Sequence, residues 1–155
     1  MKTAEHSRIF SPSSAQKVKI LLLGPSSPYY SGLVDQGRSL NLEHVSPASL
    51  VQQEISRRTP IGQSAASAIT RGSAVPDQLT LTLLRKWFWA RKPDAGFLLE
   101  GYPATLLQAL VFDEWLEARG ENLTCCFAPG LSSTDLIVTH YRTQGLLYGD
   151  LTAAA

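Results

Sequence analysis

Short apolar runs alternate with longer amphipathic segments along the chain. Four runs bounded by Gly, Pro or polar residues predict strands, at residues 18–23, 43–45, 96–99 and 123–127. The first run is almost unbroken and ends at Gly24-Pro25, a pattern typical of a parallel strand buried on both faces. A short buried helix would show the same pattern.

Segments with helical spacing and capping residues lie between the later runs. They predict helices at 46–57, 59–70, 76–90, 106–118 and 133–141. The stretch after residue 24 is rich in turn-forming residues and predicts no regular element before residue 43. Strands that alternate with helices indicate a parallel sheet with right-handed crossovers, which is a three-layer α/β fold.

The length of 155 residues predicts one domain. Residues 1–16 are rich in Ser and lack any period, so they predict a flexible N-terminal extension. Residues 17–155 then form the single α/β domain, with a helical insert at about 46–76.

Charge and composition exclude several classes of protein. Fourteen Lys and Arg face thirteen Asp and Glu, for a formal charge of +1. A dedicated nucleic-acid binder or polybasic membrane module needs a cationic surplus, so both are unexpected. No stretch predicts a membrane span or a signal peptide. The two adjacent cysteines, Cys125 and Cys126, point to opposite faces of a strand and suit a reducing, cytoplasmic compartment.

One segment resembles a known family signature. Residues 96–105 read GFLLEGYPAT, followed by Gln108. This segment is similar to the GFLLDG(F/Y)PRT signature, with its following Gln, of adenylate kinases and related nucleoside monophosphate kinases. Residues 59–62 and 71–77 resemble the ends of that family's helical monophosphate-binding insert. The resemblance covers roughly residues 17–144 and implies a P-loop NTPase-like fold with a mainly parallel sheet of about four strands.

The phosphate-binding loop departs from the family pattern GxPGAGKGT, whose glycines and Lys surround phosphate oxygens. Residues 24–32 read GPSSPYYSG, so Pro28 removes a backbone donor. The resemblance places Tyr30 at the Lys position and Gly32 at the hydroxyl that helps to hold Mg²⁺. Gly24 and Ser27 complete the remnant of the nucleotide pocket.

The phosphate-binding arginines are also replaced in the resemblance. Gln52, Ala104 and His140 stand at three of these positions, and Glu100 stands at the position of the family's Mg²⁺-site Asp. Phosphoryl transfer depends on positioning and charge stabilisation. Loss of one preorganised donor typically costs ~10²–10³ in rate. We therefore predict an inactive phosphotransferase that uses no cofactor. The alternative is a divergent but active kinase, which would need ATP and Mg²⁺.

The adenine side is better preserved. Val75, Gly101 and Gln108 match positions that face adenine in the family, and a Gln amide can pair with a base edge. They predict a remnant adenine-nucleoside site. The competing interpretation makes Gly101 a turn residue and Gln108 a helix-surface amide. Likewise, Glu100 is either a remnant of the Mg²⁺ site or a hydrogen-bonded carboxylate at a strand end.

The expected partners are proteins. The family's lid and fifth strand are expected to be missing, which would leave Leu123 to Phe127 as a sheet edge that a terminus, a second copy or another protein must cover. Of these, we expect a protein partner or a second copy. Residues 85–92 interleave cations and aromatics; they suit base stacking, a partner contact, or simply the basic last turn of an amphipathic helix. No metal site is expected, since no Cys or His accompanies His140 at ligand spacing. Ser26, Ser27 and Ser31 lack the setting of a nucleophile.

Overall fold

The computed structural model describes residues 17–148. The predicted N-terminal extension, residues 1–16, therefore lies outside the described residues. The chain divides into two compact units, one formed by the chain up to His44 and from Pro93 onward, the other by Val45–Lys92. The second unit contains the predicted insert and continues past it to Lys92.

A four-stranded sheet has the order β2-β3-β1-β4. The strands are listed as β1 (Lys19–Leu22), β2 (Glu43–Val45), β3 (Phe97–Glu100) and β4 (Cys125–Phe127). Strand β1 pairs in parallel with both β3 and β4, so that Leu21 stands between Leu99 and Cys126. The α/β fold with a parallel sheet is confirmed, and the alternative of a short helix at the first apolar run is wrong.

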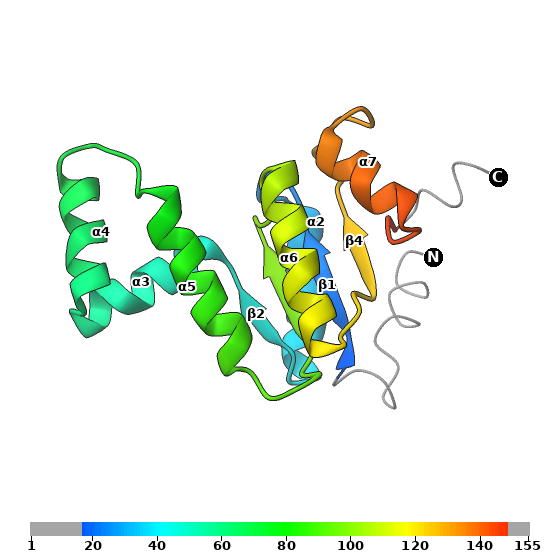
Figure 1. Cartoon of the computed structure of the whole chain (residues 1–155), viewed down its shortest axis with the longest axis horizontal. Coiled ribbons are helices and arrows are strands. Elements are labelled where there is room, and N and C mark those ends of the chain that lie inside the picture. Colours follow the sequence, from blue (N-terminus) through cyan, green and yellow to red (C-terminus); the bar gives the residue numbers. More distant parts are fainter. Residues whose placement is uncertain (1–16, 149–155) are drawn as a thin grey trace. The chain divides into compact units, whose positions relative to one another are not determined.

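Helices cover both faces of this sheet (Figure 1). Those of the first unit are α2 (Pro28–Ser39), α6 (Leu106–Arg119) and α7 (Leu136–Thr143). On one face, Tyr30 and Leu33 of α2 join a buried cluster with Ile20 and Leu98. On the other face, the ring of Phe112 in α6 meets the ring of Phe97 edge to face, with centroids 6.3 Å apart. Alternation along β3 thus supplies both halves of the core.

Helix α2 corrects the expectation of a turn-rich segment between residues 24 and 42. Ser27 caps the helix and Pro28 occupies its first turn. The buried positions Tyr30, Leu33, Val34 and Gly37 have helical spacing. Tyr, Ser and Gly are weak helix formers, so burial of this one face, and not intrinsic propensity, stabilises the helix.

The second unit contains three helices, α3 (Pro47–Arg57), α4 (Pro60–Thr70) and α5 (Asp77–Ala90). Each was expected within a residue or two. Gly62 lets α4 approach α3 closely, because a Cβ there would lie 2.0 Å from the carbonyl oxygen of Glu54. Any larger residue at position 62 would force the two helices apart.

Of the covers expected for the outer edge of β4 at Leu123 to Phe127, the structure shows the chain itself, so the edge is not left exposed. Residues 146–148 run beside it: the Cys126 N–H donates to the Leu146 oxygen and the Tyr148 N–H donates to the Cys126 oxygen, both at 2.8 Å. Cys126 and Leu147 form a parallel bridge. Leu123 and the three strand residues are all buried. The chain itself therefore satisfies the middle of this edge.

Within residues 17–148, no helix is long and apolar enough to cross a membrane.

Candidate functional site

The turn between β1 and α2 lies at the carboxyl end of the central strand, where a phosphate loop would sit. Gly24 adopts a φ of +80°, and a Cβ there would lie 2.9 Å from Cγ of Leu131. In the loop after β4, Gly130 also lies close to this turn, since a Cβ there would come within 3.2 Å of the Pro25 ring. The loop after β4 therefore packs directly on this turn, and Gly24 is required by both conformation and space.

The first turn of α2 is closed by its own groups. The Ser27 hydroxyl accepts a hydrogen bond from the Tyr29 N–H at 3.2 Å, and the Ser27 carbonyl accepts one from the Tyr30 N–H at 2.9 Å. Pro28 has no N–H to offer. The donors that a helix N-terminus normally presents to an anion are, at these positions, satisfied or missing.

Tyr30 points into the core. Its side chain is buried, and its hydroxyl donates to the carbonyl oxygen of Leu23 and lies 3.0 Å from that of Phe127. It thereby links the chain at the ends of β1 and β4. Burial, with the nearby Glu100 carboxylate, raises the pKa of Tyr30 far above its ordinary value, so the hydroxyl stays protonated.

Beside this turn lies a polar cavity of about 240 Å³. Nine residues line it, namely Ser26, Ser27, Tyr30, Ser31, Val34, Asp35, Arg38, His44 and Glu100. Inside it, Nε2 of His44 lies 2.8 Å from Oε1 of Glu100, and both side chains are largely buried. Glu100 is thus a hydrogen-bonded carboxylate at a strand end.

The residues around Glu100 do not fit the family's Mg²⁺ site. Gly32 is exposed and has no hydroxyl, and the imidazole of His44 engages the Glu100 carboxylate. Among residues 17–148 no three His, Cys, Asp or Glu side chains are grouped to hold a metal ion.

The segment between β3 and α6, which carries the family signature, is also closed by its own groups. Gly101 is exposed with a φ of +81°, and its N–H donates to the Leu22 oxygen at 2.9 Å. Thr105 caps α6 by accepting from the Gln108 N–H at 3.1 Å. The Gln108 side-chain oxygen accepts from the Ala104 N–H at 2.8 Å. This leaves the NH₂ group of Gln108 and the second lone pair of its oxygen for a ligand.

His140 lies against an acidic partner that sequence spacing did not indicate. Its Nε2 is 2.7 Å from Oδ2 of Asp113, and the Gln144 amide nitrogen donates to the same carboxylate oxygen at 3.1 Å. These contacts join α6 to α7. His140, at one of the expected phosphate positions, is therefore used together with Gln144 in a contact between helices.

The two remaining positions belong to the second unit. Gln52 is an exposed residue of α3, and Val75 is a half-buried residue in the segment between α4 and α5.

A parallel sheet in the order β2-β3-β1-β4, with helices on both faces and a glycine turn after the central strand, defines a P-loop NTPase-like protein. The family model for adenylate kinase matches residues 35–139, and so begins after the glycine turn. An adenylate kinase of Moorella thermoacetica is 36% identical over 110 residues, or 68% of this chain and 49% of the relative. One from Clostridium botulinum (strain Eklund 17B / Type B) is 34% identical over 110 residues, or 68% and 50%.

The chain belongs to the adenylate kinase family. It spans about half the length of the curated relatives that it matches.

Two residues of these contacts were not predicted from the sequence. His44 is one residue from the start of a short strand and lies 56 positions from Glu100; Asp113 lies 27 positions from His140. Strand adjacency would have brought His44 near Glu100, since β2 and β3 are neighbours. The Asp113 contact depends on the relative rotation of two helices, for which the sequence carries no signal.

Proposed function

We propose that this chain is an adenylate-kinase-like protein that does not transfer phosphate and acts through protein contacts. The closure of the first turn of α2 by Ser27 and Pro28 is the observation that carries the proposal. A phosphate would have to displace these internal hydrogen bonds, and the cationic Lys expected from the family is replaced by the inward-pointing Tyr30.

The positive charge that phosphoryl transfer needs is also weak at the carboxyl end of the sheet. Glu100 is engaged by His44, and His140 by Asp113. Removal of one preorganised donor typically costs ~10²–10³ in rate, and several are replaced together in this chain. The same substitutions argue against Mg²⁺ and ATP as cofactors.

A weak adenine-nucleoside site remains part of the proposal. Gly101 is exposed beside the signature turn, and the Gln108 NH₂ group has a donor to offer to a base. Because Gln52 and Ala104 stand where the family has phosphate-binding arginines, a phosphate on the nucleoside should add no affinity.

The decisive experiment is an ADP-forming assay on the full 155-residue chain with ATP, AMP and Mg²⁺. The adenylate kinase of Moorella thermoacetica serves as the active control. We expect no ADP above the enzyme-free blank. Measurable turnover that grows with the concentration of the chain would refute the proposal and favour the divergent kinase.

A calorimetric titration tests the nucleoside site. Adenosine and AMP should bind with similar affinity, and Gln108→Ala should weaken both about tenfold, the equivalent of ~1.4 kcal/mol. Gln63→Ala, an exposed amide on α4, is the matched control and should change neither. If AMP binds much more tightly than adenosine, the chain still binds the phosphate group. If neither binds, the nucleoside site is removed from the proposal.

A cytoplasmic location also belongs to this proposal. It is supported by Cys125 and Cys126, which are both free thiols and both buried.

A further inference from the structure

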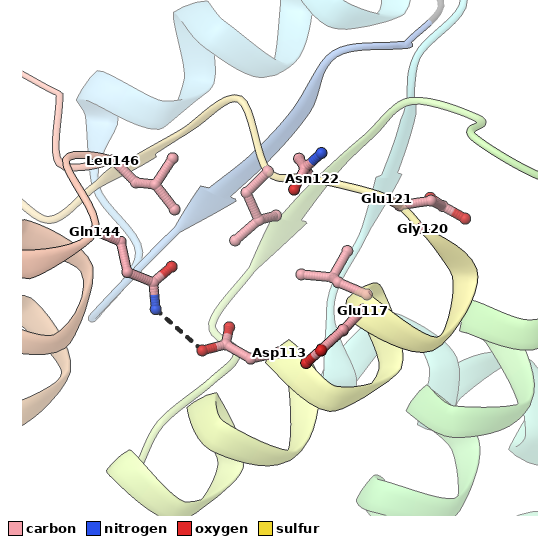
Figure 2. Close-up of a pocket in the computed structure, with 9 residues that line it drawn as sticks. Asp113, Glu117, Gly120, Glu121, Asn122, Gln144 and Leu146 are labelled. Carbon is pink, nitrogen blue, oxygen red and sulfur yellow. Dashed lines mark hydrogen bonds between the residues drawn. The ribbon is translucent and has the colours of Figure 1, made fainter.

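A cavity of about 510 Å³ opens between α6, the turn that follows it, and residue 146 (Figure 2). Three leucines give it an apolar lining, Leu116, Leu123 and Leu146. Leu116 and Leu123 are buried, while Leu146 is half-buried. A cavity lined in this way suits a large apolar side chain.

Carboxylates lie beside these leucines on the α6 side. Asp113 and Glu117 come from α6, whereas Glu121, after the turn at Gly120, points away from the leucines (Figure 2). Asp113 is held in place by His140 and Gln144. Glu121 is buried and paired with Arg119 at 3.0 Å and with Lys19 at 3.9 Å, whereas Glu117 is exposed at the side of the cavity. A ligand that matches this surface is apolar where it meets the leucines and cationic where it meets Asp113 and Glu117.

The last two turns of α5 carry that chemistry. Arg85, Lys86 and Trp89 are all exposed and share one face of the helix, since they are three and four residues apart, and Lys92 follows the helix end. Trp89 is 43% exposed and is the only aromatic among the exposed large hydrophobic residues of 17–148. We call these four residues the α5 basic face.

One further cation at this helix end, Arg91, stacks on aromatic rings of its own unit. The Arg91 guanidinium lies over the rings of Trp87 and Phe88, 5.5 Å and 4.5 Å from their centroids. This stacking anchors Arg91 on its own unit. The α5 basic face is therefore a separate surface on the outside of the helix.

We propose that the α5 basic face of one copy docks in the α6 cavity of a second copy. Trp89 enters between the leucines, and the cations on either side of it face Asp113 and Glu117. Aromatic residues that fill a partner's pocket usually dominate such contacts, while the surrounding charges set orientation and rate. The near-zero net charge of the chain permits this, because no general repulsion keeps copies apart.

The contact is head to tail. Each copy has one α5 basic face and one α6 cavity, so association either closes into a ring or continues as a chain. The inference rests on the proposed function in that it supplies the partner for a protein that acts through protein contacts.

Analytical ultracentrifugation of the full chain provides the first test. We expect the mean mass to rise with concentration, and to fall again between about 0.1 M and 1 M NaCl, where the Debye length drops from ~10 Å to ~3 Å. A monomer at every concentration in low salt would overturn the proposal, as would assembly that salt leaves unchanged.

Charge reversals then locate the two surfaces. Glu117→Lys in the cavity and Lys86→Glu on the α5 basic face should each weaken association about tenfold or more. Glu114→Lys, an exposed residue of the same helix outside the cavity lining, and Arg57→Glu on α3 are the matched controls and should behave as wild type. Equal effects of test and control variants would count against the two surfaces.

Mixing the two test variants is the sharpest measurement. The Glu117→Lys chain retains an intact α5 basic face and the Lys86→Glu chain an intact cavity, so an equimolar mixture should associate more strongly than either variant alone. A mixture that stays monomeric would refute the head-to-tail contact. The ADP-forming assay on the same samples separates the two proposals, because turnover by an assembled chain would refute only the lack of activity.

Discussion

Two tyrosines follow neighbouring strands of the sheet and are treated differently by the fold. Tyr30 lies in α2, after β1, and its buried hydroxyl reaches the carbonyl oxygens of Leu23 and Phe127. Tyr102 lies after β3 in the signature segment, is equally buried, and its hydroxyl has no hydrogen-bond partner among residues 17–148. Of the two buried hydroxyls, the one in the better preserved segment is thus the one without a partner.

The difference shows what each segment contributes. Around Tyr30, residues that depart from the family pattern make internal bonds, and the Tyr30 hydroxyl joins the chain at the ends of β1 and β4. Around Tyr102, the residues match the signature, and Gln108 and Thr105 close the helix start with their own side chains. In both segments the side chains' internal bonds decide which groups are left for a ligand.

The largest expected effect is at the joint. Tyr30→Ala removes a buried ring together with its hydrogen bonds, so we expect the free energy of unfolding to fall by ~3–5 kcal/mol. Urea denaturation followed by far-UV circular dichroism measures it. A loss below about 1 kcal/mol would show that Tyr30 does not join the two strands.

Removal of the hydroxyl alone should separate the two tyrosines. Tyr30→Phe leaves a buried carbonyl oxygen without its donor and should cost ~1–2 kcal/mol. Tyr102→Phe removes a hydroxyl that has no partner in the described chain, so the free energy of unfolding should change by less than ~0.5 kcal/mol or rise. Equal losses in the two variants, measured by the same denaturation, would break the comparison.

The helix caps offer a subtler test. Ser27→Ala and Thr105→Ala each remove the acceptor of a first-turn N–H, so both should lose ~1 kcal/mol of stability. Ser31→Ala, exposed in the second turn of α2, is the control and should change little. If Ser27→Ala created affinity for ATP by freeing the Tyr29 N–H, the closure of this turn would be the main barrier to phosphate binding.

The smallest effect should appear only in alkali. Burial raises the pKa of Tyr102 to about 12, above its value of 10.0 in an unfolded chain. The folded state therefore retains the proton longer, so stability is complete below pH 10 and declines as the pH rises toward 12. Tyr102→Phe should reduce that decline in urea midpoints measured between pH 9 and 12; an unchanged decline would assign it to Tyr30, Tyr141 or the cysteines.

Much of the fold was predictable because its signals are local. The apolar runs at β1 and β3 are continuous. Capping residues mark the starts of α3 and α4, at Ser46-Pro47 and Thr59-Pro60. Helix α2 was missed because its residues have low helix propensity and its burial comes from contacts with β1 and β3. For the candidate site, the sequence predicted which residues take part but not their contacts. The hydrogen bonds of Tyr30, Glu100 and His140 join residues that are far apart in the sequence.

By itself, the sequence determined the family, the parallel α/β architecture and the replacement of charged positions by Tyr30, Gln52 and Ala104, because these follow from residue identity and short-range pattern. The tertiary structure decided where the replaced side chains go: Tyr30 into the core, His140 onto Asp113, and residues 146–148 onto the edge of β4. Those outcomes depend on contacts between segments distant in sequence, and packing selects such contacts only when the whole sheet is assembled.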